Sequence, residues 1–276
     1  MTNLMQMTAE WNMTNLILGS SAIALYLCGW VIHILKLRDE GRFKSTILQI
    51  IAAAAIVLHG FTISGLLFTE MGLDLGLLKI LALLALVINS LVWISGLRKT
   101  LHSLYLVLFP IAALTLACAL ASPSTKAPAL MSHSLQAHIL LSILAYSFLA
   151  IAALQALLSG YQNWQLKHKH QNALMRTLPA LETMETLLFE LIWVGEIALT
   201  LSLLSGFLVY DDFFAQQLIH KVTFSLIAWL IYAVLIFGRH YYGWRGQRAI
   251  NWTWIGFSAI LLGYIGSKFV IEFILN

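Results

Sequence analysis

Long apolar runs, separated by short polar stretches, follow one another along almost the whole chain. Each run holds about twenty residues, which is the length that an α-helix needs to cross the hydrocarbon core of a bilayer. The pattern therefore predicts an all-α fold, a polytopic transmembrane helical bundle of about eight spans. The predicted ranges are 13–37, 45–68, 75–97, 103–121, 137–159, 188–210, 221–238 and 252–274.

The basic residues of the loops predict the orientation of this bundle. Short loops that are rich in Lys and Arg stay on the cytoplasmic side of a membrane. Here every second loop is basic, whereas the loops between carry acidic residues or few charges; the basic stretches are 38–44, 98–99, 167–176 and 239–248. We therefore expect both termini on the outer side.

Two inner loops have local features of their own. Gly243 and Gly246 in the last basic loop allow a tight reversal of the chain. Residues 162–187 form the longest inner segment, and Leu174, Leu178 and neighbouring apolar residues recur in it every three to four positions. This spacing predicts a short amphipathic helix on the inner leaflet, interrupted by Pro179.

Composition excludes several classes of protein. With 60% hydrophobic and 10% charged residues, the chain has too little polar surface for a soluble globule. The formal charge of +4 is spread over loops without a basic tract, which argues against a nucleic-acid partner. Cys28 and Cys118 lie in separate apolar runs without a CxxC motif, which argues against a thiol-disulfide carrier. The N-terminus lacks a basic region, so the first run is expected to be a retained span rather than a cleaved signal peptide.

Two histidines open predicted helices on the outer side, and they are the first candidates for a site. His138 shares a helical face with Ser142, Ala145 and Tyr146, which are small or amphipathic and let a flat ligand approach. A neutral imidazole is a good ligand for haem iron, so the pattern favours a haem b site with His138 and His220 as the axial pair. The alternative is that both histidines only anchor or cap their helix ends at the membrane interface.

A haem site also needs cations for the propionate groups. Lys221 adjoins His220, and Lys79 and Lys268 lie toward the outer ends of their helices, although Lys268 can instead pair with Glu272 four residues later. Zinc is less favoured, because no HxxxH or HxH pattern occurs on the outer side.

His59 differs from these residues in its depth. It lies about 13 Å below the outer end of its predicted helix, on a face with Ala52, Ala55 and Thr62. An ionisable side chain at this depth indicates a functional site, so we expect His59 either to bind a second haem or to hydrogen-bond to an adjacent helix. The inner histidines are expected to be solvated or to extend toward the interface; they are His33, His102, His168, His170 and His240.

Two further polar residues lie inside predicted helices and support a second hypothesis. Glu196 and Asn89 could line a pathway or form an interhelical hydrogen bond. In this alternative the protein is a small transporter or an accessory membrane subunit, its histidines are structural and Glu196 is the protonatable centre. The helices lack the Gly- or Pro-broken pairs of discontinuous transporter helices, which argues against it.

The second half of the chain resembles a known family. The segments AHILLSILAYSFLAIAALQALLSGYQ, LPALETMETLLFELIWVGEIALTLSLLSGFL, IHKVTFSLIAWLIYAVLIFGRHYYGWRGQRA and WIGFSAILLGYIGSKFV are similar to the cytochrome c assembly family, whose CcsA- and CcmC-type members are haem-handling membrane proteins. The resemblance covers about 135–271 well and the first four predicted helices weakly. It implies an N-terminal four-helix segment, 1–121, followed by a cytochrome c assembly-like four-helix unit, 122–276.

The resemblance also implies a function and a location. It places the family's first outer histidine at His138 and a haem site at the outer face of a bacterial inner membrane. The partners that it implies are the lipid bilayer, haem and other membrane proteins of cytochrome assembly, and the role is that of an assembly factor rather than a catalyst. Members that attach haem carry a tryptophan-rich WWD motif in an outer loop, but the corresponding loop here, YDDFFAQQLIHK, has no tryptophan. No histidine follows the last predicted helix, and His240 is a few residues out of register with an inner histidine of the CcsA branch.

Overall fold

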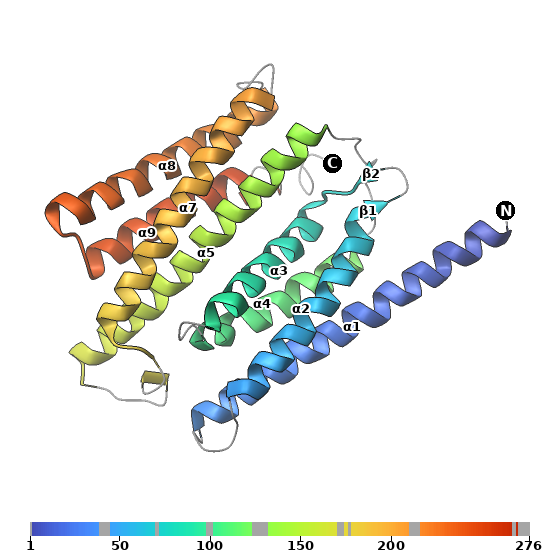
Figure 1. Ribbon diagram of the computed structural model, residues 1–276, viewed down its shortest axis with the longest axis horizontal. Coiled ribbons are helices and arrows are strands. Elements are labelled where there is room, and N and C mark those ends of the chain that lie inside the picture. Colours follow the sequence, from blue (N-terminus) through green and yellow to red (C-terminus); the bar gives the residue numbers. More distant parts are fainter. Residues whose placement is uncertain are drawn as a thin grey trace. The chain divides into compact units, whose positions relative to one another are not determined.

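The computed structural model describes residues 2–38, 45–69, 72–97, 102–122, 132–169, 174–175, 178–209, 216–266 and 269. Within these ranges the protein is all-α apart from one two-stranded hairpin, and it divides into two compact units, residues 1–131 and 132–276. Each unit is described below by itself. The colours of Figure 1 follow the chain from the first unit, in blue to green, to the second, in green to red.

The first unit holds four α-helices: α1 (Thr2–Arg38), α2 (Ser45–Leu67), α3 (Leu77–Gly96) and α4 (Tyr105–Ala121). A hairpin of β1 (Phe68–Thr69) and β2 (Gly72–Leu73) connects α2 to α3, and a 3-10 turn, His102–Leu104, precedes α4. Helix α1 packs against α2 and α4, and α3 packs against α4 and α2 (Figure 1). Small residues on the packed faces let the helices approach closely. On α2, for example, the buried residues Ala52 and Ala55 lie between the larger buried residues Leu48 and His59.

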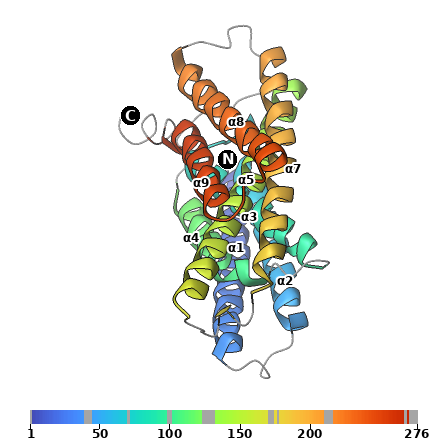
Figure 2. The ribbon, with the colours of Figure 1, turned by 90° about the vertical axis from the view of Figure 1, so that its left-hand side faces the viewer.

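The second unit is built around α5 (His133–Lys167) and α7 (Leu181–Val209), which pack against each other along their length. Helix α8 (Gln216–Tyr242) packs against α7, and α9 (Gln247–Leu261) packs against both α8 and α5 (Figure 2). Helix α9 continues as a π-helical turn, Leu262–Gly266.

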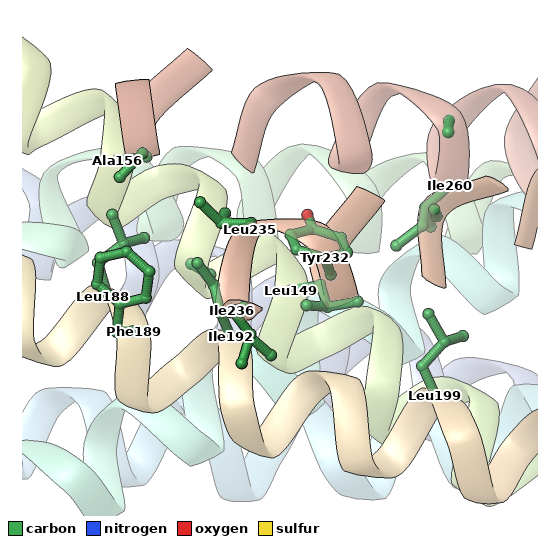
Figure 3. Close-up of a cluster of buried hydrophobic side chains, with 14 of the residues drawn as sticks. Leu149, Ala156, Leu188, Phe189, Ile192, Leu199, Tyr232, Leu235, Ile236 and Ile260 are labelled. Atoms are coloured by element: carbon green, nitrogen blue, oxygen red, sulfur yellow. The ribbon is translucent and has the colours of Figure 1, made fainter. Parts of the chain in front are cut away.

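The core of the second unit depends on small residues of α5. Ala145, Ala152 and Ala156 are fully buried on the face of α5 that meets its neighbours. On α7, a Cβ atom added at Gly195 would lie 2.6 Å from Leu149 Cδ2, so this glycine allows the two helices to approach closely. Figure 3 shows the larger side chains that fill the remaining space; they are Leu149, Leu188, Phe189, Ile192, Leu199, Tyr232, Leu235, Ile236 and Ile260.

The structure confirms a polytopic helical membrane protein. Among the residues that the structure describes, six helices are long and apolar enough to cross a membrane: α2, α3, α5, α7, residues 13–38 of α1 and residues 219–242 of α8. Helix α4 is apolar but has 17 residues, and α9 has 15 before its π-helical turn. Large apolar side chains are exposed on the outside of the helices, for example Leu208, Phe207 and Leu140, which is what contact with lipid requires.

The prediction of a separate helix is wrong at both ends of residues 162–187, although the described residues 174–175 between them are helical. Residues 162–167 are the last turns of α5, and Leu181 to Leu187 are the first two turns of α7 rather than part of a separate helix. Pro179 lies just before α7, as expected for a residue that interrupts helical structure. Met184 and Glu185 are buried in the unit, so tertiary contacts, not an interfacial position, explain the apolar spacing.

The turn between α8 and α9 follows the sequence-based prediction. Gly243 has φ +63° and Gly246 has φ +59°, a left-handed conformation that residues with a side chain adopt at a cost. The carboxylate of Glu185 holds this turn, because Oε1 accepts from the Gly246 backbone N–H at 2.9 Å and Oε2 accepts from Arg245 Nε at 3.3 Å.

Candidate functional site

His138 lies in the second turn of α5, half-buried against α7. Its Nδ1 is 3.0 Å from the backbone oxygen of Ser202 and 3.0 Å from Ser205 Oγ. A carbonyl oxygen can only accept a hydrogen bond, and Ser205 Oγ donates its own proton to Ser202 O at 2.8 Å. Both contacts therefore place the proton of a neutral imidazole on Nδ1 and its lone pair on Nε2.

A pair of serine hydroxyls fixes this arrangement. Ser142 Oγ, one turn along α5, donates to the backbone oxygen of His138 at 2.8 Å. It also lies 2.7 Å from Ser202 Oγ on α7. The ring of His138 is thus held by hydrogen bonds that join two packed helices, and this limits the rotation of the imidazole.

The face of α5 that carries His138 continues into an aromatic and cationic cluster. Tyr146 OH lies 3.4 Å from Ser225 Oγ on α8, and the ring of Tyr146 lies 5.6 Å from that of Tyr264 in the π-helical turn. Lys221 Nζ lies 5.8 Å from the centroid of Tyr264. Tyr264 therefore links Lys221 to Tyr146, which lies about two turns further along α5 than His138.

Ser202, Ser205 and Tyr264 were not among the site residues predicted from the sequence. The two serines stand three residues apart in an otherwise apolar run, SLLSGF, so they share a helical face. The spacing of these two serines could have been used to predict a polar contact on this face of the helix. Nothing in the local sequence indicates the π-helical turn that carries Tyr264; π-helical turns in other proteins are frequent at functional sites.

The structure describes His220, one of the two remaining outer candidates, but not Lys268. His220 is in the second turn of α8, beside Lys221, and its side chain is exposed. Its pairing with His138 stays a prediction. Lys268 and Glu272 lie outside the described residues.

His59 belongs to the first unit and is fully buried in α2. Its Nδ1 lies 3.3 Å from Tyr26 OH on α1, and the two rings meet edge to face with centroids 5.8 Å apart. Tyr26 in turn contacts Phe109, which stacks on Tyr105 of α4. A hydrogen bond to an adjacent helix was one of the two predictions for His59, and it is confirmed.

Lys79 and His33 do not behave as expected from sequence. Lys79 is 2% exposed and forms an ion pair with Asp74, which neutralises the charge proposed for a propionate group. His33 was expected to be solvated or to reach the interface, but it is 5% exposed on the packed face of α1. The partner of Lys79, Asp74, lies only five residues earlier in the chain, whereas His33 is buried because its helix packs against others.

The buried polar residues Glu196 and Asn89 are both inside their units. Asn89 Nδ2 donates to the backbone oxygen of Ala85 in the same helix at 2.8 Å. Glu196 is 7% exposed on α7. Neither carboxylate oxygen of Glu196 has a hydrogen-bond partner in the part of the chain that the structure describes.

The donor set at His138 suits a metal that brings most of its own ligands. Among the described residues, His, Cys, Asp and Glu side chains form no group of three or more that could hold a bare metal ion. Haem iron takes four ligands from its porphyrin and needs only axial side chains from the protein. His138 supplies one oriented imidazole, and Tyr146, about two turns further along α5, contacts Tyr264, whose ring lies 5.8 Å from Lys221 Nζ.

Comparisons with known proteins identify the family of the chain. The sequence profile of the family described as "Cytochrome C assembly protein" matches residues 16–275, which includes the first unit as well as the second. The chain is 31% identical over 226 residues to "Inner membrane protein YpjD" of Escherichia coli K12, covering 81% of this chain and 86% of that protein. It is 25% identical over 152 residues to "Cytochrome c biogenesis protein CcsA" of Chlamydomonas reinhardtii, covering 54% of this chain and 42% of that protein. The CcsA of Prochlorococcus marinus MIT 9301 is 27% identical over 172 residues, or 55% of this chain and 56% of that protein.

These matches confirm the resemblance drawn from the sequence and extend it to the first four helices, where it had looked weak. No solved structure matches the chain.

Proposed function

Because this chain belongs to the cytochrome c assembly protein family, we propose that it is an inner-membrane protein that binds and handles haem b. The location follows that of its relative, the inner membrane protein YpjD of E. coli, and the haem chemistry follows the cytochrome c biogenesis relatives. Its role in this proposal is that of an assembly factor, with other membrane proteins of cytochrome assembly as partners, rather than that of a catalyst.

One observation supports this proposal more than any other: His138 Nδ1 donates to the carbonyl of Ser202. Histidines that bind metals almost always donate their second ring N–H to a carbonyl or carboxylate, which fixes the tautomer and makes the ligating nitrogen more basic. The bond to Ser202 would let His138 present Nε2 as an axial ligand of haem iron.

The surroundings of His138 also fit a porphyrin. The neighbouring positions on α5 are small or aromatic, and Lys221 is close enough to Tyr264 to lie at the edge of the same face. In the proposed site His138 and His220 would hold the iron, and Lys221 and Lys268 would bind the propionate groups. When bound, the haem would supply a redox-active iron.

We also propose a complete topology of eight spans with both termini outside. Helix α4 is 17 residues long and α9 extends through its π-helical turn, so both can cross part of the bilayer while packed against longer neighbours. Basic residues at one end of the helices, such as Lys36, Lys167 and Arg239, set the inner side.

Cysteine labelling tests this topology. In a variant without Cys28 and Cys118, a cysteine at His133 should react with a membrane-impermeant maleimide from the outside of intact cells. A cysteine at Lys167 should react only in inside-out vesicles, because α5 separates the two exposed positions by a full span. The opposite pattern would overturn the orientation and with it the outer placement of His138.

An absorbance spectrum tests the proposed function directly. The full-length protein, purified in mild detergent from haem-replete cells, should show an intense Soret band with a pyridine haemochrome spectrum of haem b. A preparation that contains no haem, and takes up none when haem is added, would refute haem binding.

The transporter hypothesis keeps one specific observation in its favour, the buried carboxyl group of Glu196. It requires a solute that crosses the membrane, and family membership gives it no support. It would replace the haem proposal only if the spectrum showed no bound haem and substitution of Glu196 changed a measured flux.

A further inference from the structure

Glu196 is a buried acid that no group in the described part of the second unit neutralises. It lies in the middle of α7 and is 7% exposed, and both of its oxygens lack a hydrogen-bond partner among the described residues. Figure 3 shows the apolar side chains of this core, Leu149, Ile192 and Leu199 among them. An ionised carboxylate in such surroundings loses its hydration and gains no partner in return.

The hydrogen-bond donors near Glu196 are used elsewhere. Tyr232 of α8 is buried in the same core, and its hydroxyl donates to the backbone oxygen of Thr253 at 3.1 Å. Trp229 Nε1 donates to Thr200 Oγ1 at 2.9 Å, and Thr200 Oγ1 donates to the backbone oxygen of Glu196 at 2.8 Å. These contacts leave the side-chain oxygens of Glu196 without a donor from α8 or from its own helix.

The titratable group that α5 contributes to this core also has another contact. Tyr146 packs against the same cluster of side chains, and its hydroxyl lies 3.4 Å from Ser225 Oγ. Tyr146 and Tyr232 are both neutral phenols at physiological pH, so neither supplies a positive charge to Glu196. Nor does Glu196 form an ion pair with any residue that the structure describes.

Glu185, on the same helix, is the natural comparison. It is 6% exposed, compared with 7% for Glu196. Its Oε1 accepts from the Gly246 N–H at 2.9 Å, and its Oε2 accepts from Arg245 Nε at 3.3 Å. Two donors, one of them charged, stabilise an ionised carboxylate at Glu185, whereas Glu196 has neither.

We infer that Glu196 is a proton-binding site, a carboxylic acid that is protonated at neutral pH in the resting protein. The inference does not depend on haem, because it rests on the core between α5, α7 and α8. A neutral acid needs no counter-charge, and it can release its proton when a cation or a hydrogen-bond donor enters the core. A change in helix packing around Glu196 would therefore be accompanied by uptake or release of a proton.

Infrared spectroscopy of the full chain in lipid vesicles decides the protonation state. At pH 7 the wild-type protein should show the C=O stretching band of a protonated carboxyl group, shifted by exchange into deuterium oxide. The band should be lost in Glu196→Gln and retained in Glu185→Gln, which serves as the matched control. An identical band in the wild type and in Glu196→Gln, or no such band in the wild type, would overturn the inference.

Labelling with dicyclohexylcarbodiimide gives a second, chemical readout. The carboxyl group transfers its proton to one carbodiimide nitrogen and its oxygen adds to the central carbon; the acyl group then moves to the other nitrogen, giving a stable N-acylurea with no leaving group. Mass spectrometry should find this adduct on the peptide that contains Glu196 at pH 7, several-fold less of it at pH 9, and little on the peptide that contains Glu185. An adduct at Glu185 in preference to Glu196 would contradict the inference.

Discussion

Replacing His138 by alanine should remove most of the Soret absorbance of the haem-loaded protein. The substitution deletes the proposed axial nitrogen and leaves the carbonyl of Ser202 and the hydroxyl of Ser205 without their imidazole partner. Loss of a ligand should weaken haem binding by more than the ~10- to 100-fold that is typical of losing a group that only orients a ligand. The measurement is the ratio of Soret to protein absorbance after purification, together with a haem titration of the apoprotein.

His133→Ala is the matched control for this experiment. His133 is an exposed histidine at the start of the same helix, so its loss should leave the spectrum unchanged. Ser205→Ala removes one contact of Nδ1 but keeps the Ser202 carbonyl, and it should shift the band or weaken binding less than His138→Ala does. His220→Ala should also lose or shift the band if His220 is the second axial ligand, whereas His59→Ala should leave it. A haem-loaded His138→Ala protein with a wild-type spectrum would show that the iron is bound elsewhere.

Replacing Asp74 by alanine should strongly destabilise the first unit. Asp74 accepts from Lys79 Nζ and from the Gly76 backbone N–H, and the side chains of Asp74 and Lys79 are each 3% exposed. Removing one member of a buried ion pair leaves the other charge without compensation, at a cost of about 3–5 kcal/mol. The measurement is the midpoint of chemical unfolding in detergent micelles.

A double variant separates this cause from a general loss of packing. Asp74→Ala combined with Lys79→Met removes both charges and should recover most of the lost stability, because apolar residues often replace a buried pair without penalty. Arg245→Ala is a useful contrast, since the Arg245 side chain is 62% exposed and its ion pair should contribute less than about 1 kcal/mol. Equal effects of Asp74→Ala and Arg245→Ala would contradict the prediction.

The apolar centres of the helices could be predicted from the sequence, and the predicted bounds of α2, α3 and α4 are correct to within two residues, whereas α5, α7 and α8 begin or end four to eight residues beyond theirs. The reason is physical: inside a bilayer every backbone group must bond within its own segment, so an apolar run of sufficient length has no alternative to a helix. The tight turn at Gly243 and Gly246 was predictable for the same kind of local reason, because a positive φ favours glycine. The packed face of His59 with Ala52, Ala55 and Thr62 was also correct, since helical periodicity alone defines it.

Predictions that depended on a partner from another part of the chain were less successful. The segment before α7 was expected to be a surface helix, but Met184 and Glu185 are buried against neighbours that its own sequence does not reveal. His33 was expected near the interface, but it lies on the packed face of α1. Lys79 also looked available for an anion, but it pairs with Asp74, a partner that is local in the sequence, five residues earlier.

By itself, the sequence determined the membrane class, the helical segments, the candidate residue His138 and the family. These follow from composition, periodicity and motif, which are properties of single segments. Tertiary structure alone decided which nitrogen of His138 carries the proton and that Tyr264 links Lys221 to Tyr146. It also decided that the carboxyl group of Glu196 lacks the hydrogen-bond donors that Glu185 has. Each of these depends on which atoms of a second helix lie within hydrogen-bond or contact distance, and packing fixes that only when the helices come together.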